Sequence, residues 1–139
     1  MNPNMLQDAL SYANRGWHVF PCHTNRCSVS DATTDARQIR KWWKKWPDAD
    51  IGIATGAKSG IIVLDVDPRR GGDESLAELF PGDLPRTATA HNGIGGTQFF
   101  FANRGRNVPS RVNFLRGIDV HGDGDYVLAP SHGNTEELA

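Results

Sequence analysis

The sequence predicts a single α/β (α+β) domain with a mixed or antiparallel sheet and flanking helices. Segments with apolar residues at helical spacing alternate with short apolar runs rich in β-branched and aromatic residues. The 139 residues fit one domain of ordinary size, and no internal repeat interrupts them. With 38% hydrophobic and 22% charged residues, the composition excludes a disordered chain. We therefore expect residues 1–139 to form one folding unit.

Three segments have the pattern of helices. Residues 4–14 carry apolar side chains at helical spacing, and Gly16 follows at a common stop position. A second helix should begin near Thr34 or Asp35, either of which can cap it, and end at Pro47. A third, short helix should begin near Asp73 and end before the proline-rich stretch that follows.

Short apolar runs predict the strands, and glycine-rich or polar stretches predict the connections. Residues 21–31 lack periodicity and predict a loop. The glycine-rich turn at 92–96 predicts a hairpin between its flanking runs. The predicted strands are 17–20, 51–55, 61–67, 86–91, 97–102, 118–120 and 126–129.

The second predicted helix carries an aromatic stripe and a basic run. Its apolar residues fall at i, i+3, i+4 and i+7: Ile39, Trp42, Trp43 and Trp46. Packing on a sheet explains this stripe more simply than a base-stacking platform, so we assign the tryptophans to the core. The formal charge of −1 means that nucleic-acid binding would need a local basic patch. Two runs qualify: residues 37–45 and residues 104–116.

Three aspartates give the strongest functional signal. Asp65 and Asp67 end an apolar strand, and alternation places both side chains on one face. Such a pair is costly to bury unless a cation compensates the charges, and carboxylate oxygens suit Mg²⁺ or Mn²⁺. Asp119 lies between apolar neighbours in another predicted strand and can supply a third ligand. A solvated Asp-x-Asp turn is the simpler alternative for the first two.

Two further groups of residues are weaker signals. The turn at 92–96 can expose backbone N–H groups to a triphosphate, although most such turns only close hairpins. Cys22, His23 and Cys27 are potential zinc ligands, but a fourth ligand is not evident, so we favour a metal-free loop with simple thiols. The chain has no leader-like start and no apolar run of about 18 residues, so we expect a soluble, cytoplasmic protein without membrane contact.

Together these motifs resemble the N-terminal primase-polymerase domain of plasmid and phage replication proteins, in the archaeo-eukaryotic primase superfamily. The resemblance spans most of the chain, and its most specific part is Leu64-Asp65-Val66-Asp67-Pro68-Arg69. The other matching segments are 9–21, 31–35, the Trp42-Trp43 helix, 51–56, 59–60, 71–72, 117–124 and 126–131. The chain ends soon after Ser131, earlier than we expect for a complete catalytic unit of this family.

The resemblance implies a palm with a modified RNA-recognition-motif-like sheet and templated primer synthesis from nucleoside triphosphates. It implies that Asp65, Asp67 and Asp119 bind two catalytic Mg²⁺ or Mn²⁺ ions. The partners implied are a DNA template, nucleoside triphosphates and a replicative helicase. The nucleotide-binding residues implied are Asn92, Gly93, Gly95, Gly96, Gln98 and His121.

Two positions depart from the family pattern. Gln98 stands where the family usually has a histidine, and glutamine can donate a hydrogen bond but carries no charge. His121 replaces a common arginine and so removes a permanent charge. His91 is a candidate to compensate, although a solvated loop histidine is the simpler interpretation. We expect weaker nucleotide affinity or slower catalysis.

Two other functions remain open at this point. The departures at Gln98 and His121 suit a catalytically weak or inactive palm that binds nucleic acid or nucleotides as an accessory factor. A structural interaction domain is the third interpretation, with the acids binding a stabilising cation such as Ca²⁺. A nucleotide-dependent gain in metal affinity would separate an active site from this last case.

Overall fold

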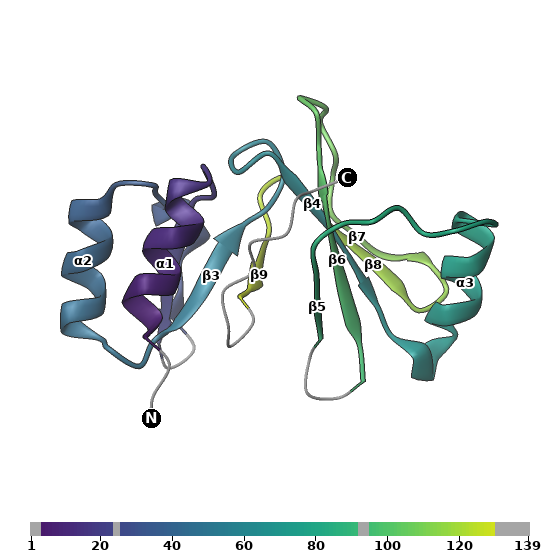
Figure 1. Ribbon diagram of the computed structural model, residues 1–139, viewed down its shortest axis with the longest axis horizontal. Helices are drawn as coiled ribbons and strands as arrows, with labels where there is room; N and C mark the ends of the chain where they lie inside the picture. The colour runs from purple at the N-terminus through teal and green to yellow at the C-terminus, as the bar shows by residue number, and fades with distance from the viewer. Residues whose placement is uncertain (1–3, 24–25, 92–94, 130–139) are drawn as a thin grey trace.

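The computed structural model describes residues 4–23, 26–91 and 95–129, and within them the α/β prediction is confirmed (Figure 1). The helices are α1 (Met5–Asn14), α2 (Ala36–Lys45) and α3 (Gly72–Leu79), with 3-10 turns η1 (Val29–Asp31) and η2 (Pro68–Arg70). The strands are β1 (Val19–His23), β2 (Arg26–Cys27), β3 (Asp50–Ala54), β4 (Ile61–Val66), β5 (Thr89–His91), β6 (Thr97–Ala102), β7 (Arg111–Leu115), β8 (Ile118–His121) and β9 (Tyr126–Leu128).

The strands form two sheets rather than the single sheet that the sequence predicted. The first has the order β2-β1-β3-β9 and the second has the order β5-β6-β4-β8-β7. Neighbouring strands in both sheets pair antiparallel. The chain crosses between the sheets after β3, where Gly56 and Gly60 have φ of 78° and 73°. A Gly56–Ile61 bridge and a hydrogen bond from the Gly60 N–H to the Gly56 carbonyl at 2.8 Å close the turn. Such positive φ values favour glycine, which lets the chain change sheet there.

The predicted helices are confirmed with small shifts at their ends. Asn4 caps α1 by accepting a hydrogen bond from the Gln7 N–H at 3.1 Å. Of the two candidate caps for α2, Asp35 has the role and accepts from the Arg37 N–H at 3.0 Å. These side chains satisfy N–H groups that have no partner within the helix.

The predicted loop at 21–31 is wrong in part, and two strands, β2 and β7, were missed. β1 extends to His23 because its backbone pairs with β3 up to Cys22 and with β2 at its end, where Cys22 lies opposite Cys27. Tertiary pairing here overrides the polar composition. Cys22 and Cys27 form a disulfide instead of the thiols expected. β7 was not predicted although Arg111 to Phe114 alternate polar and apolar residues, and in the structure it is a mostly exposed edge strand.

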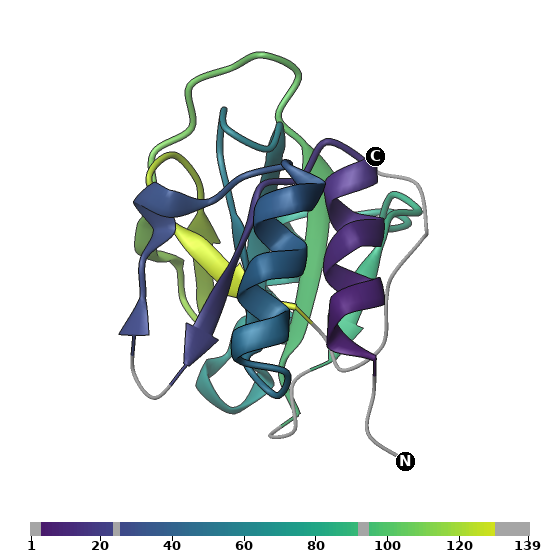
Figure 2. The ribbon, with the colours of Figure 1, turned by 90° about the vertical axis from the view of Figure 1, so that its left-hand side faces the viewer.

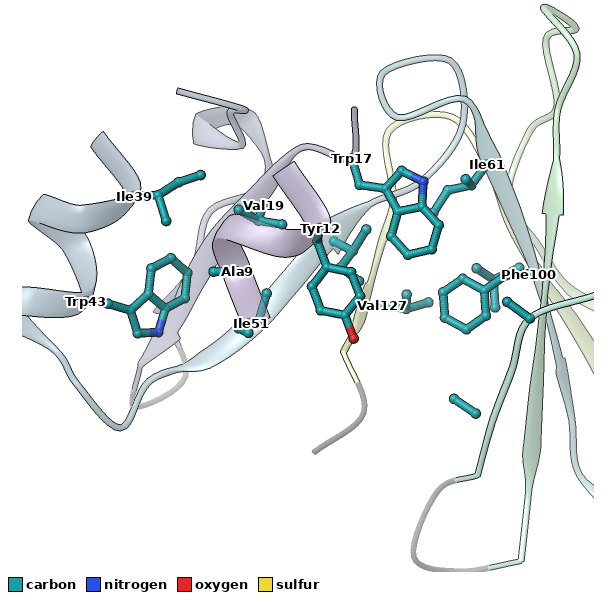
Figure 3. Close-up of a cluster of buried hydrophobic side chains, with 14 residues drawn as sticks. Ala9, Tyr12, Trp17, Val19, Ile39, Trp43, Ile51, Ile61, Phe100 and Val127 are labelled. Carbon is teal, nitrogen blue, oxygen red and sulfur yellow. The ribbon is translucent and has the colours of Figure 1, made fainter. Parts of the chain in front are cut away.

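The main core is shared by α1, α2 and both sheets, and a smaller core lies between α3 and the second sheet. α1 and α2 lie side by side on the first sheet (Figure 2), and α3 packs beside β4 and β8 of the second sheet (Figure 1). The main core joins the two sheets, because Trp17 stacks on Tyr12 at 5.5 Å and on Phe100 of β6 at 5.7 Å between ring centroids (Figure 3).

The assignment of the α2 tryptophans to the core is correct for one of the three. Trp43 is buried, and its indole N–H donates to the Ala49 carbonyl at 3.1 Å. Trp42 and Trp46 are half-buried and also line a surface pocket. The helical stripe is wider than the face that the sheet covers, so its edge remains in contact with solvent.

Asp123 joins the turn after β3 to the second sheet. Its Oδ1 accepts from the Ala57 N–H at 2.8 Å, and its Oδ2 accepts from the Val108 N–H at 2.9 Å. Nearby, the buried Thr55 hydroxyl donates to the Gly122 carbonyl at 2.6 Å. These contacts fix the loop between β8 and β9 against the point where the chain crosses between sheets.

We predict that Asp123→Ala lowers the free energy of unfolding by about 2 kcal/mol, because two backbone donors lose a charged acceptor. Urea unfolding followed by circular dichroism measures the change. Asp83→Ala, at an exposed carboxylate in the loop after α3, is the control and should change the free energy by less than about 0.5 kcal/mol. Equal stability of the two variants would contradict the assigned role of Asp123.

Candidate metal and nucleotide site

The pairing of β4 with both of its neighbours places three predicted site residues in one row. Asp65 on β4 lies directly opposite Asp119 on β8 and directly opposite Gln98 on β6. Residues opposite one another in an antiparallel pair project from the same face, with Cβ atoms about 4.5–5.5 Å apart. The side chains of Gln98, Asp65 and Asp119 therefore lie side by side across three adjacent strands.

Asp67 follows the end of β4 and stays close to β8. Its backbone is extended, with φ −107° and ψ 106°, so alternation keeps its side chain on the Asp65 face. The Asp67 N–H donates to the Gly117 carbonyl at 2.8 Å, and the Gly72 N–H donates to the Asp67 carbonyl at 2.9 Å. A Cβ at Gly72 would lie 2.7 Å from the Gly117 oxygen, so this close backbone approach requires glycine.

Arg70 links Asp67 to Asp119. Its guanidinium Nε lies 3.8 Å from Asp67 Oδ2, and its Nη2 lies 3.6 Å from Asp119 Oδ1. Asp119 Oδ1 also accepts from the Asn113 N–H at 2.8 Å, and Arg70 Nη2 donates to the Asn113 side chain at 3.3 Å. One protein cation thus lies within reach of two of the three predicted metal ligands.

Asp67 has a second basic neighbour that favours its charged form. Arg69 donates to the Asp67 carboxylate from its side chain, with Nε 3.3 Å from Oδ1, and from its backbone N–H at 3.0 Å. These hydrogen bonds, helped by the charges of Arg69 and Arg70, hold the pKa of Asp67 below its ordinary value. Asp67 is therefore ionised at neutral pH, as a metal ligand must be.

His121 lies on the same face as Asp65 and between two carboxylates. Its Nε2 is 3.6 Å from Asp65 Oδ2, and its Nδ1 is 2.8 Å from Asp125 Oδ2. Asp65, and after it Asp125, raise the pKa of His121 above its ordinary value, although burial opposes them. His121 consequently carries positive charge over a wider pH range than a free histidine.

A hollow of about 590 Å³ opens between the two sheets beside this row. The second sheet contributes Asp65, His91, Gln98 and His121 to its walls, and the rest of the lining includes Asp125 and Tyr126. Its volume falls in the roughly 300–1,000 Å³ range typical of small-molecule sites. Asp67 and Asp119 are not among the residues that line it. Thr97 Oγ1 lies 3.3 Å from His91 Nδ1, at the same end of the sheet as Gln98.

The predicted site residues are therefore only partly gathered. Asp65, Gln98 and His121 share the hollow, Asp119 adjoins Asp65, and Asp67 connects to Asp119 through Arg70. Gly95 and Gly96 lead into β6, with Gly95 at φ 91°, whereas Asn92 and Gly93 lie outside the described residues. Across residues 4–23, 26–91 and 95–129, no three His, Cys, Asp or Glu side chains are grouped closely enough to hold an ion.

The residue types nevertheless suit a hard divalent cation. Three carboxylates on neighbouring backbone positions supply the oxygen donors that Mg²⁺ and Mn²⁺ prefer. The guanidinium of Arg70 already lies between two of them, and the imidazole of His121 lies beside the third. The three carboxylates thus already attract positive charge, and their oxygen donors fit a bound divalent metal.

Sequence reasoning missed Arg70 and Asp125. Arg70 follows the acidic motif by three residues, where the short η2 turn brings its side chain back to Asp67. Asp125 lies four residues after His121, but no helix relates them, so spacing alone gave no reason to pair them. The resemblance supplied no signal for either residue.

Comparison with known families accounts for nearly the whole chain. A family model described as bifunctional DNA primase/polymerase, N-terminal, matches residues 9–137. No curated protein matches the sequence. Among the described residues, none of the helices has the length and apolar character needed to cross a membrane. The match covers both sheets and every candidate site residue, and the chain belongs to the bifunctional DNA primase/polymerase N-terminal family.

Proposed function

We propose that this chain is a metal-dependent nucleotidyltransferase that makes or extends primers on a DNA template. The row of Gln98, Asp65 and Asp119 beside a hollow of nucleotide-compatible size is the observation that carries the proposal. Family membership supports primase/polymerase chemistry with DNA and nucleotide substrates. The family's occurrence in plasmid and phage replication proteins suggests a cytoplasmic role there, with a replicative helicase as a partner.

In this proposal Asp65, Asp67 and Asp119 hold Mg²⁺ or Mn²⁺. Bound ions would polarise the reacting phosphate and favour deprotonation of the primer 3′-hydroxyl. The three carboxylates must first turn from their present partners toward a common point. Arg70 would leave Asp67 and Asp119, since a divalent ion supplies the charge that its guanidinium now supplies.

Gln98 and His121 would contact the incoming triphosphate from opposite sides of Asp65. Both line the hollow, and each lies on a strand that pairs with β4. His121 can donate a charge-assisted hydrogen bond to a phosphate oxygen when protonated, with Asp125 orienting its ring through Nδ1. Gln98 can donate only a neutral hydrogen bond.

A catalytically weak palm that binds nucleic acid or nucleotides as an accessory factor is the second candidate. The uncharged amide of Gln98, directly opposite Asp65, favours it, because a cationic donor at that position would interact more strongly with a triphosphate. The contacts of Arg70 with Asp67 and Asp119 also favour it, since a metal ion must compete with them. The two candidates differ in whether the wild-type protein extends a primer.

We predict that Asp65→Ala and Asp119→Ala each reduce primer extension with Mn²⁺ at least about 100-fold, because each removes a metal ligand worth several kcal/mol in the transition state. Extension of a labelled primer on a single-stranded template measures this. Glu78→Gln, at an exposed carboxylate on α3, controls for the loss of one negative charge and should retain full activity. Extension that survives both aspartate substitutions would rule out the metal site.

Gln98→His should raise kcat/KM for the nucleoside triphosphate about tenfold, since a protonated imidazole at this position adds a charged donor to the phosphates. Single-nucleotide incorporation at several triphosphate concentrations measures the change. Gln7→His, on the exposed side of α1, introduces the same residue far from the hollow and should have no effect. No gain from Gln98→His would mean that the amide is not what limits nucleotide use.

A further inference from the structure

A second hollow opens beside the first sheet, between β1, η1 and α2. It has a volume of about 550 Å³, and among the described residues none lines both this hollow and the one beside Asp65. Aromatic rings form much of its wall, namely Phe20 and His23 of β1 together with Trp42 and Trp46 of α2. We call it the aromatic pocket, and the proposed catalytic chemistry makes no use of it.

Three of the four rings of the aromatic pocket are accessible to solvent, whereas Phe20 is buried. His23 is exposed, and Trp42 and Trp46 are half-buried, in contrast to the neighbouring Trp43. The imidazole of His23 stacks on the Trp46 indole, with centroids 5.8 Å apart and planes inclined by 21°. One flat heteroaromatic ring thus already packs on this indole, and a nucleobase has the same planar shape.

The helix that carries the two tryptophans is strongly basic. α2 has the sequence ARQIRKWWKK, with five exposed Lys and Arg residues and no acidic residue, in a chain whose formal charge is −1. Lys41 and Lys45 lie one turn apart on the side of the helix next to Trp42 and Trp46, whereas Lys44 lies on the opposite side. The Lys45 ammonium lies 4.8 Å from the centre of the Trp46 ring.

Aromatic surface beside a local row of cations is the combination that single-stranded nucleic acid requires. Bases stack on the rings, and the phosphates between them are held by Lys and Arg. Asp31, a carboxylate of the pocket wall, disfavours a phosphate inside the pocket but can accept a hydrogen bond from the amino group of a base. The charge pattern therefore places bases inside the pocket and phosphates along α2.

One pair of rings separates the aromatic pocket from the hollow beside Asp65. Phe20 lines the aromatic pocket and meets Tyr126 edge to face, with ring centroids 5.2 Å apart. Tyr126 in turn lines the hollow that contains Asp65 and Gln98. The two hollows therefore adjoin the same ring pair, of which Phe20 is buried.

We propose that the aromatic pocket binds a base of single-stranded template DNA by stacking, with Lys41 and Lys45 holding the adjacent phosphates. This inference rests on the proposed function for the identity of the strand as a template. The stacking and the charge pattern do not depend on catalysis. A binding assay without metal or nucleotide therefore tests the pocket separately from the enzyme activity.

The test measures the affinity of the full chain for a fluorescently labelled single-stranded oligothymidylate by anisotropy, in EDTA and at fixed salt. Trp46→Ala should weaken binding about 5- to 100-fold, the loss expected for one stacked base, whereas Trp46→Phe should retain most of the affinity. Lys45→Ala should weaken binding several-fold and reduce its salt dependence, and Lys44→Ala, on the opposite side of the helix, should do so less. Circular dichroism checks that each variant is folded.

An abasic oligonucleotide of the same length separates stacking from charge. The wild type should bind it more weakly than oligothymidylate, and Trp46→Ala should remove that difference. Equal wild-type affinity for the two oligonucleotides, or unchanged affinity of a folded Trp46→Ala variant, would overturn the proposal. If the pocket instead binds a peptide, Trp46→Ala should leave the affinity for oligothymidylate unchanged. The same substitution should then weaken binding of a proline-rich peptide.

The two proposals fail in different ways. If Trp46→Ala leaves oligothymidylate binding intact while Asp65→Ala abolishes primer extension, the proposed role of the aromatic pocket is wrong and the proposed enzyme activity is supported. If Trp46→Ala weakens oligothymidylate binding while the wild type extends no primer, the proposed role of the pocket is supported and the proposed enzyme activity is wrong. Asp65 lies in the other hollow, so Asp65→Ala should not weaken oligothymidylate binding in EDTA.

Discussion

The register of β4 is the constraint on which the site depends. Ile61 and Val63 face the main core between the sheets, whereas Leu64 and Val66 face the smaller core beneath α3. A slip of one residue would exchange these sets and turn Asp65 toward the apolar residues packed beneath α3, where an ionised carboxylate is costly. Burial on both faces of one strand thus fixes which residues stand opposite Asp65. Those residues are Asp119 and Gln98.

The electrostatics of the site follow from this crowding of acids. Asp65, Asp67 and Asp119 would repel one another if they were left alone, and the structure places Arg69, Arg70 and His121 among them. These contacts are partly exposed, so each stabilises the fold only modestly. Because these ion pairs are weak, the proposed divalent ion could replace the basic side chains at the carboxylates without unfolding the sheet. The same arrangement therefore stabilises the acids and leaves them open to metal.

Much of this arrangement could be predicted from the sequence, and the failures have physical causes. Apolar periodicity and caps such as Asp35 located the helices, and the acids at the end of an apolar strand located the carboxylates. The division into two sheets could not be predicted, because strand partners depend on long-range packing such as the contact of Trp17 with Phe100. Arg70 and Asp125 were missed for the same reason, since folding alone brings them to the acids.

The α2 tryptophans show how one pattern can serve two purposes. The helical stripe predicted burial correctly for Trp43, but periodicity cannot tell how wide a face the sheet covers. Trp42 and Trp46 lie at the edge of that face, beside His23 and next to Lys45. The sequence pattern favoured core packing over base stacking for all three tryptophans. In the structure, Trp42 and Trp46 are half-buried and line the aromatic pocket, so base stacking is proposed for this edge of the helix.

The most direct test of the site is to locate bound Mn²⁺ by its paramagnetic broadening of backbone amide signals in an NMR spectrum of the wild-type protein. At substoichiometric Mn²⁺, the signals of residues 65–67 and 117–121 should broaden together, because β4 and β8 hold these acids side by side. The signals of α2 should stay sharp. Broadening that spares residues 117–121, or that centres on another part of the chain, would contradict a shared metal site.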